Sequence, residues 1–234
     1  MHPALNRAKA ALDAVSSVAV IVAAAAIAWS VFAKTGAPVA RPQQPPVADV
    51  SNLSIDGSKA TNSLGTGSVV IVSFSDFQCP YCKRFASETF PRLRSELIDA
   101  GAVRFVEMQF PLTTIHPLAL GASAAAECAR QQGKYWEMHE RLFDSAALER
   151  VNLTRHASEL ALDPGRFGAC LDSTETEAAV RRDLAEGERL GVKGTPAFFV
   201  GREQPDGSIR LFRRVNGAGS FELFSDEVKR LAEI

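Results

Sequence analysis

The sequence of 234 residues is poor in cysteine and has no excess of charge of either sign. Its four cysteines are too few for a disulfide scaffold in a chain of this length. They contain one Cys-x-x-Cys pair rather than two, and no His pair completes a ligand set, which argues against a zinc-ribbon site. The 26 Lys and Arg residues are balanced by 27 Asp and Glu, whereas nucleic-acid binders usually carry a basic excess.

One long hydrophobic run lies near the amino terminus. Residues 14–33 are uncharged and almost entirely apolar, and a helix of about 20 residues spans the hydrocarbon core of a bilayer. Arg7 and Lys9 precede the run, within a short flank of residues 1–13. The pattern predicts a transmembrane signal anchor that is not cleaved. A signal peptide cleaved after Ala33 and a buried soluble helix are the alternatives.

A proline-rich segment follows this run. Residues 34–50 include Pro38, Pro42, Pro45 and Pro46 among small and polar residues. Such a composition has little to bury and favours an extended chain. We expect a linker that holds a folded domain away from the membrane.

The first part of the remaining chain has the pattern of a βαβ unit. The β-branched run at 68–74 predicts a buried strand, and 103–108 predicts a second strand. Residues 83–100 between them have helical composition, with Pro91 expected to kink the helix. Strand, helix and strand over this length predict a parallel pair with a right-handed crossover.

The later part of the chain changes in character twice. Helices are expected at 118–132, 135–143, 154–162 and 175–190, then strands at 197–200 and 209–215, and a final helix at 220–234. We therefore predict an α/β fold with one mixed sheet, built from residues 51–115 and 191–234. Residues 116–190 would form an all-helical insertion. The basic residues Arg210, Arg213 and Arg214 are expected on the solvated side of an edge strand.

Cys79 and Cys82 are the most informative residues of the sequence. They stand where a predicted strand ends and a helix begins, and Pro80 fits the first helical turn. The positive end of the helix dipole favours a thiolate, so we expect Cys79 to be the nucleophile with a lowered pKa. Cys82 lies one turn further on, where it can attack a mixed disulfide from within. Half of a metal site and a purely structural disulfide are the alternatives.

Three separated motifs carry a resemblance to a known family. The segments Phe74-Ser-Asp-Phe-Gln-Cys-Pro-Tyr-Cys82 and Gly191-Val-Lys-Gly-Thr-Pro-Ala-Phe-Phe199 resemble the active site and the cis-proline loop of DsbA-like thiol:disulfide oxidoreductases of the thioredoxin superfamily. The stretch Gly133-Lys-Tyr-Trp-Glu-Met-His-Glu-Arg-Leu-Phe143 resembles the inserted helical domain of that family. The resemblance extends over about residues 50–234 and implies a thioredoxin-like sheet.

The resemblance assigns roles to single residues. It implies that Cys79 is the attacking cysteine and that Cys82 resolves the mixed disulfide. Pro80 and Tyr81, the two residues between these cysteines, would influence the redox potential of the pair. The resemblance also implies a cis peptide bond between Thr195 and Pro196, beside which a peptide substrate would bind.

The other two cysteines lie in the predicted insertion, and one residue departs from the family pattern. Some family members have a second bridge at this place, so we expect a structural disulfide between Cys128 and Cys170. Two free buried cysteines are the alternative. The family commonly has a buried acid six residues before the first cysteine, and here that position is Ser73.

The expected activity is the introduction of disulfides into secreted proteins that contain cysteines, without metal or cofactor. By resemblance, a quinone-linked membrane oxidase of the DsbB or vitamin-K-epoxide-reductase type would re-oxidise the chain. The catalytic domain is expected in the periplasm, anchored to the inner membrane of a bacterium or soluble after signal cleavage. An isomerase or reductase of the same fold, and a non-catalytic peptide-binding holdase, are the alternatives.

Overall fold

The computed structural model describes residues 26, 29–30, 44–145 and 147–233. Gln44–Ile234 forms one compact unit, which is described here by itself. No helix found in the described ranges is long and apolar enough to cross a membrane. The predicted spanning segment 14–33 lies outside the described residues, apart from Ala26, Trp29 and Ser30. Residues 1–13 and 34–43 lie outside them as well.

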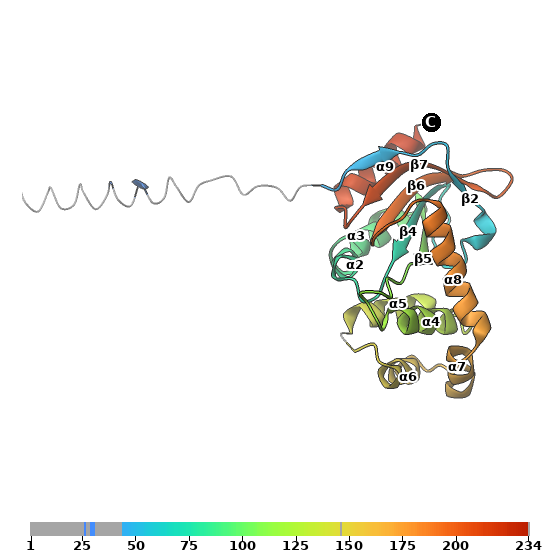
Figure 1. Cartoon of the computed structure of the whole chain (residues 1–234). Helices are drawn as coiled ribbons and strands as arrows, with labels where there is room; N and C mark the ends of the chain where they lie inside the picture. Colours follow the sequence, from blue (N-terminus) through green and yellow to red (C-terminus); the bar gives the residue numbers. More distant parts are fainter. Residues whose placement is uncertain (1–25, 27–28, 31–43, 146, 234) are drawn as a thin grey trace, which may run out of the picture. The chain divides into compact units, whose positions relative to one another are not determined.

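A mixed sheet of seven strands forms the centre of this unit (Figure 1). The strand order is β1-β7-β6-β4-β5-β3, and β2 pairs with β7. The strands are β1 (Val47–Asp49), β2 (Ser54–Ile55), β3 (Ser63–Leu64), β4 (Val69–Ser75), β5 (Val103–Gln109), β6 (Ala197–Glu203) and β7 (Ile209–Asn216). All seven residues of β4 are buried, as its run of β-branched residues predicts for a central strand.

The pairing of the strands confirms the predicted mixed sheet. β4 and β5 are parallel, with Val69 opposite Val103 and Ser75 opposite Gln109. β6 runs antiparallel to both β4 and β7. The turn between β6 and β7 makes the predicted hairpin. Because β6 also pairs with β4, this hairpin joins the early strands in one sheet.

Helices cover both faces of the sheet (Figure 1). One face packs against α8 (Thr174–Arg189) through a core that includes Val72, Phe199 and the partly buried Leu184. The other face packs against the helical stretch after Cys79 and against α9 (Phe221–Ala232). Five rings, those of Phe85, Phe90, Phe105, Phe198 and Phe224, fill that second core.

The helical stretch after Cys79 alternates between α- and π-type turns. It consists of α2 (Pro80–Arg84), the π-helical η2 (Phe85–Thr89), α3 (Phe90–Leu93) and the π-helical η3 (Arg94–Ile98). The change in hydrogen bonding before Pro91 has a physical reason, because a proline nitrogen has no hydrogen to donate to the turn before it. Around Pro91, where a kink was predicted, the helix has π-type turns before and after the short α3.

Among the described residues, five helices lie between β5 and β6. Besides α8, they are α4 (Ala119–Arg130), α5 (Tyr135–Asp144), α6 (Arg150–Glu159) and α7 (Pro164–Leu171). The helical insertion is thus confirmed, and α4 to α7 lie together at one end of the sheet (Figure 1). α7 was not predicted, although Asp163 caps it and Pro164 begins it, which are ordinary signals of a helix start. The core of the insertion is continuous with Phe77, Cys79 and Cys82.

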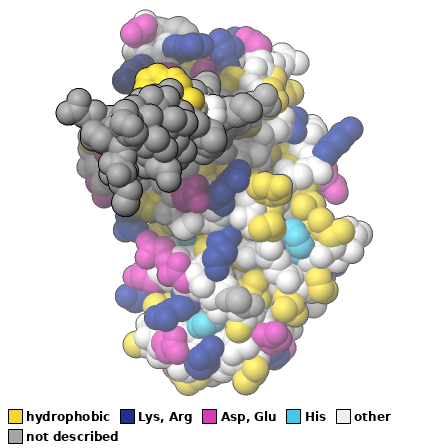
Figure 2. Space-filling view, turned by 90° about the vertical axis from the view of Figure 1, so that its left-hand side faces the viewer, with side chains coloured by type: hydrophobic (Ala, Val, Ile, Leu, Met, Phe, Trp, Pro, Cys, Tyr) yellow, Lys and Arg dark blue, Asp and Glu magenta, His cyan; other side chains and the backbone are white. Residues whose placement is uncertain are grey.

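Two expectations from the sequence are corrected. The predicted linker 34–50 is not a linker throughout, because Val47–Asp49 forms β1 and pairs with β7. The extended conformation that Pro45 and Pro46 favour leads directly into this strand. β7 is consequently no edge strand, since β1 and β2 cover its outer side. The surface shown in Figure 2 carries both signs of charge interspersed, in keeping with the balanced composition.

Candidate active site

Cys79 lies at the junction of β4 and α2, at the N-cap position of the helix. Its backbone N–H donates to the carbonyl oxygen of Asp76 at 3.0 Å, which closes the turn. The carboxylate of Asp76 is fully buried and accepts from the backbone N–H groups of Gln78 at 2.7 Å and Leu112 at 2.8 Å. His116 Nδ1 is 2.8 Å from the same carboxylate. Asp76 therefore ties the turn before Cys79 to the segment after β5.

The electrostatics of Cys79 favour the thiolate. Hydrogen bonding from the Cys82 side chain lowers the pKa of Cys79 to about 5, assisted by the backbone N–H groups of Cys82 and Tyr81, while burial opposes the shift. These N–H groups belong to the first turn of α2, where they have no partner within the helix. Cys79 is 4% exposed, so its sulfur is enclosed and a substrate must approach it closely.

Cys82 has the opposite character. It is 1% exposed, and burial together with the neighbouring Cys79 raises its pKa well above the ordinary value. Both cysteines are free thiols here, so the structure represents the reduced pair. A thiolate at Cys79 beside a thiol at Cys82 is the arrangement that nucleophilic attack by the first cysteine requires.

The loop before β6 faces the pair of cysteines. The peptide bond between Thr195 and Pro196 is cis. Cys79 Sγ lies 3.3 Å from the carbonyl oxygen of Thr195, to which it donates in its thiol form. The carbonyl oxygen of Pro196 accepts from Gly217 N at 2.7 Å, which fixes the loop to the end of β7. The structure thus brings Cys79, Cys82, Thr195 and Pro196 together.

The two residues between the cysteines face solvent. Pro80 is exposed at the first turn of α2, and Tyr81 is 56% exposed. The guanidinium of Arg84 lies 5.3 Å from the centre of the Tyr81 ring. Because its side chain is exposed, Tyr81 can contact a molecule that approaches Cys79.

Ser73 is buried, and an acid lies directly across from it on the neighbouring strand. Ser73 pairs with Glu107 in the parallel register of β4 and β5, so both side chains point to the same face of the sheet. Glu107 is 3% exposed, and its Oε1 atom is 3.7 Å from Nε2 of His139. Sequence reasoning missed this buried pair. The alternation Val103, Phe105 and Glu107 was the signal that Glu107 faces inward.

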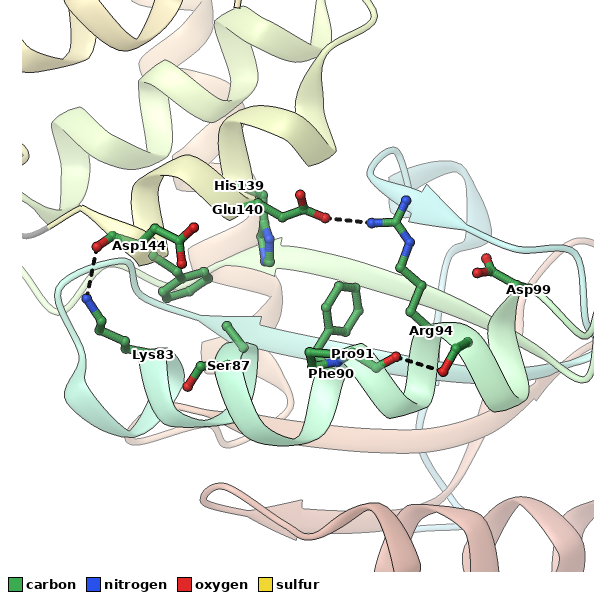
Figure 3. A pocket seen from close by; sticks show the side chains of 12 residues that line it. Lys83, Ser87, Phe90, Pro91, Arg94, Asp99, His139, Glu140 and Asp144 are labelled. Carbon is green, nitrogen blue, oxygen red and sulfur yellow. Dashed lines mark hydrogen bonds and ion pairs between the residues drawn. The ribbon is translucent and has the colours of Figure 1, made fainter.

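A cavity of about 480 Å³ lies between the stretch α2–η3 and α5, as Figure 3 shows. Two polar contacts join its two walls. Lys83 Nζ donates to the carbonyl oxygen of Asp144 at 3.2 Å, and Arg94 pairs with Glu140 at 2.5 Å. His139 reaches into the space between these contacts, and its Nδ1 atom has no hydrogen-bond partner among the described residues. The buried imidazole of His139 therefore lines the same cavity as Lys83, which follows Cys82 on α2.

Cys128 on α4 and Cys170 on α7 form a disulfide in the structure, with Cα atoms 5.7 Å apart. Both lie in the core of the insertion, which also includes Cys79 and Cys82. In the part of the chain that is described, no group of three or more His, Cys, Asp or Glu side chains is arranged to hold a metal ion.

Comparison with known proteins shows that most of the described fold is similar to thioredoxin-like proteins. A family model described as thioredoxin matches residues 65–212. A solved thioredoxin-like oxidoreductase from Silicibacter pomeroyi is 28% identical with a TM-score of 0.62, over 76% of this chain and 98% of that chain. Alpha-DsbA1 from Wolbachia pipientis is 21% identical with a TM-score of 0.63, over 73% and 89% of the two chains. BdbD from Bacillus subtilis is 20% identical with a TM-score of 0.62, over 80% and 95%.

Curated relatives share a stretch of this sequence within much longer proteins. Na+/H+ antiporter NhaA 3 of Salinispora tropica is 36% identical over 144 residues, which are 61% of this chain and 22% of the antiporter. Na+/H+ antiporter NhaA of Herminiimonas arsenicoxydans is 38% identical over 133 residues, or 56% of this chain and 20% of the antiporter. The chain thus spans about a fifth of the length of these relatives. The family model, in contrast, matches more than half of this chain, and the predicted membership of the thioredoxin superfamily is confirmed: the chain belongs to the thioredoxin family.

Proposed function

We propose that this chain is a protein thiol:disulfide oxidoreductase that introduces disulfides into secreted proteins. The observation that carries the proposal is the contrast between the two cysteines. Cys79 has a pKa of about 5 and touches the cis-proline loop, while Cys82 is buried behind it as a thiol. Lowering the pKa of Cys79 stabilises the reduced pair, which makes the oxidised pair a stronger acceptor of electrons.

The reaction proceeds through two exchanges. A substrate thiolate attacks Cys79 Sγ of the oxidised pair, forming a mixed disulfide while Cys82 leaves as a thiolate and takes up a proton. A second substrate thiolate then attacks the substrate sulfur of the mixed disulfide, and Cys79 leaves as a thiolate. Two electrons pass from the substrate to the chain, whose pair ends reduced. The low pKa of Cys79 favours the second step, because a thiolate of low pKa is the better leaving group.

The loop of Thr195 and Pro196 is the proposed binding place for the substrate backbone. Because the Thr195 carbonyl lies 3.3 Å from Cys79 Sγ, an extended peptide held along this loop would have its cysteine next to the sulfur. Pairing of an extended peptide with an exposed backbone is a common mode of peptide recognition. Pro80 and Tyr81 face solvent on the other side of Cys79 and would contact the same peptide.

The proposed location of the catalytic domain is outside the cytoplasm, at the inner membrane of a bacterium. The apolar residues 14–33 support a signal anchor, and the disulfide between Cys128 and Cys170 is typical of proteins in oxidising compartments. Residues 51–115 and 191–234 would form the catalytic domain, with 116–190 as its insertion. A quinone-linked membrane oxidase of the DsbB or vitamin-K-epoxide-reductase type would accept the electrons from the reduced pair.

Trapping of mixed disulfides tests the proposal. With Cys82→Ser in the full chain, Cys79 still attacks protein disulfides but nothing resolves the product, so covalent adducts that disappear on reduction are expected. Cys79→Ser is the matched control and should trap nothing. Adduct formation that does not depend on Cys79 would contradict the mechanism. Full biological function of a Cys79→Ala chain would instead favour the non-catalytic holdase.

A further inference from the structure

A second hollow lies along the cis-proline loop. It has a volume of about 620 Å³, and Thr195 and Pro196 form part of its wall. Cys79 Sγ contacts the carbonyl oxygen of this same Thr195. A group that occupies the hollow would therefore lie within a few residues of a cysteine engaged with Cys79.

The charges around this hollow have one sign. Lys193 and Arg214 both line it, and none of its described lining residues is acidic. Lys193 is exposed, and the described part of the chain offers its ammonium group no ion pair. The positive charges that flank the loop are thus available to a ligand.

Arg214 in particular is not neutralised. Its guanidinium donates to the carbonyl oxygens of Leu190 at 3.3 Å and Gly191 at 2.9 Å, and to Asn216 Oδ1 at 2.8 Å. These acceptors are uncharged, and a guanidinium has five N–H donors, so two donors remain. The neighbouring Arg213 differs, because it pairs with carboxylates on two sides. Half-buried and without a carboxylate, Arg214 is held rigidly at the edge of the hollow.

The backbone of the loop adds further donors. Among the described residues, the N–H groups of Lys193, Gly194 and Thr195 donate to no backbone carbonyl. Free N–H groups beside two cations are suited to bind carboxylate oxygens as well as an extended peptide. The hollow thus combines the donors of a peptide-binding strand with an anion-binding wall.

We propose that this hollow is a substrate subsite for a carboxylate carried by the peptide close to its reacting cysteine. The inference rests on the proposed function and names its preferred substrates, which are acidic around the cysteine. Arg214 would bind the carboxylate through its free donors, since the planar guanidinium matches a carboxylate, and Lys193 would add attraction from the exposed side. Attraction between opposite charges also speeds the encounter of peptide and enzyme.

Peptides that differ only in charge test the subsite. Reduced dithiol peptides with Glu, Gln or Lys beside the cysteine, all amidated at the carboxyl end, are oxidised by the oxidised full chain at low ionic strength. We expect kcat/KM for the Glu peptide to exceed that for the Gln peptide by about tenfold, the size of one charge-assisted hydrogen bond. The advantage should shrink as salt is added. A Gln peptide with a free carboxyl end shows whether a terminal carboxylate serves as well as a side chain.

Variants of the chain test whether the preference for the Glu peptide comes from Lys193 and Arg214. Lys193→Glu should reduce the ratio between the Glu and Gln peptides or reverse it, and Arg214→Lys should reduce it while keeping the charge. Arg210→Gln is the matched control, because Arg210 lies on the same strand and does not line the hollow. Equal kcat/KM for the Glu and Gln peptides in the unaltered chain would overturn the subsite and leave the proposed function standing.

Failure of the proposed function would look different, since no peptide of any charge would be oxidised. The subsite is then judged by the binding of the same peptides with serine in place of cysteine. Tighter binding of the Glu peptide that Lys193→Glu abolishes would support it, and equal dissociation constants for the Glu and Gln peptides would refute it.

Discussion

Cys79 Sγ lies 3.3 Å from the carbonyl oxygen of Thr195, although the two residues are 116 positions apart in the chain. One is placed by the start of α2 and the other by the cis-proline loop that leads into β6. β4 and β6 pair directly, so the ends of these strands bring the two loops together. The sulfur is therefore positioned beside a backbone segment that an extended substrate could use.

The first prediction concerns the pKa of Cys79. Titration of the reduced full chain, followed by the ultraviolet absorbance of the thiolate, should show a transition near pH 5. Cys82→Ala should move this transition to higher pH, because the side chain of Cys82 makes the largest contribution to lowering the pKa of Cys79. Cys128 and Cys170 are bonded to each other and do not titrate. A transition near pH 9 in both proteins would contradict the electrostatic account.

The disulfide of the insertion gives the second prediction. Replacing Cys128 and Cys170 together by alanine should lower the free energy of unfolding, since the bond closes a loop with a sequence separation of 42. The chain-entropy model gives about 4 kcal/mol for a loop of this size. Denaturant unfolding measures the loss. Exchange rates at Cys79 should change little under conditions where the variant is folded, and their collapse would show that the bridge is not merely structural.

The third prediction tests the neighbours Ser73 and Glu107. Ser73→Glu would place two buried carboxylates side by side on adjacent strands, so we expect a loss of about 2 kcal/mol or more in the free energy of unfolding. The exchanged pair Ser73→Glu with Glu107→Ser restores a single acid and should recover much of that loss. Denaturant unfolding of all variants gives the coupling between the two positions. If the double variant's change in the free energy of unfolding equals the sum of the changes in the two single variants, residues 73 and 107 do not interact, which would contradict this account.

The same variants address proton transfer. If the buried acid of this strand pair matters for the protonation of Cys82, the pH dependence of the exchange rate should change when the acid moves from β5 to β4. Unchanged rates at every pH would mean that position 73 is immaterial to the reaction.

The fourth prediction follows from Asp183 on α8. Burial raises the pKa of Asp183 to about 7, although its carboxylate accepts from Gln109 N at 2.9 Å. The pKa is therefore higher in the folded than in the unfolded chain, so the folded state binds more protons between about pH 4 and pH 7. Linkage then requires that this group's contribution to stability is present at low pH and is lost as pH rises through 7.

Asp183→Asn keeps an acceptor for Gln109 and removes the titration. The variant should gain stability relative to the unaltered chain as pH rises from 4.5 to 8, by about 3 kcal/mol at the upper end. Denaturant unfolding across this pH range measures the difference. Glu188→Gln, an exposed acid on the same helix, serves as the control. A constant difference between Asp183→Asn and the unaltered chain at all pH values would contradict the assignment.

The sequence predicted those parts of the fold and site that depend on local pattern. The buried run of β4, the cysteines at its end and the hairpin of β6 and β7 all follow from neighbouring residues. The cis bond before Pro196 was implied only by family resemblance, because most X-Pro bonds are trans.

Other parts could not be predicted because they depend on contacts between distant segments. The position of Glu107 matters because it lies beside Ser73 on the next strand. Arg214 is held by the carbonyl oxygens of Leu190 and Gly191, which directly follow α8. The pairing of Val47–Asp49 with β7 likewise needs a partner about 165 residues away, which the local proline-rich composition does not reveal.

The reduction potential of the Cys79–Cys82 pair tests the central claim most directly. The full chain is equilibrated with mixtures of reduced and oxidised glutathione, and the fraction of reduced pair is measured. Stabilisation of the Cys79 thiolate predicts a potential near the oxidising end of the range, about −120 mV, as for strong donors of disulfides. A value near −270 mV would contradict the account, since a pair of that potential would reduce its substrates.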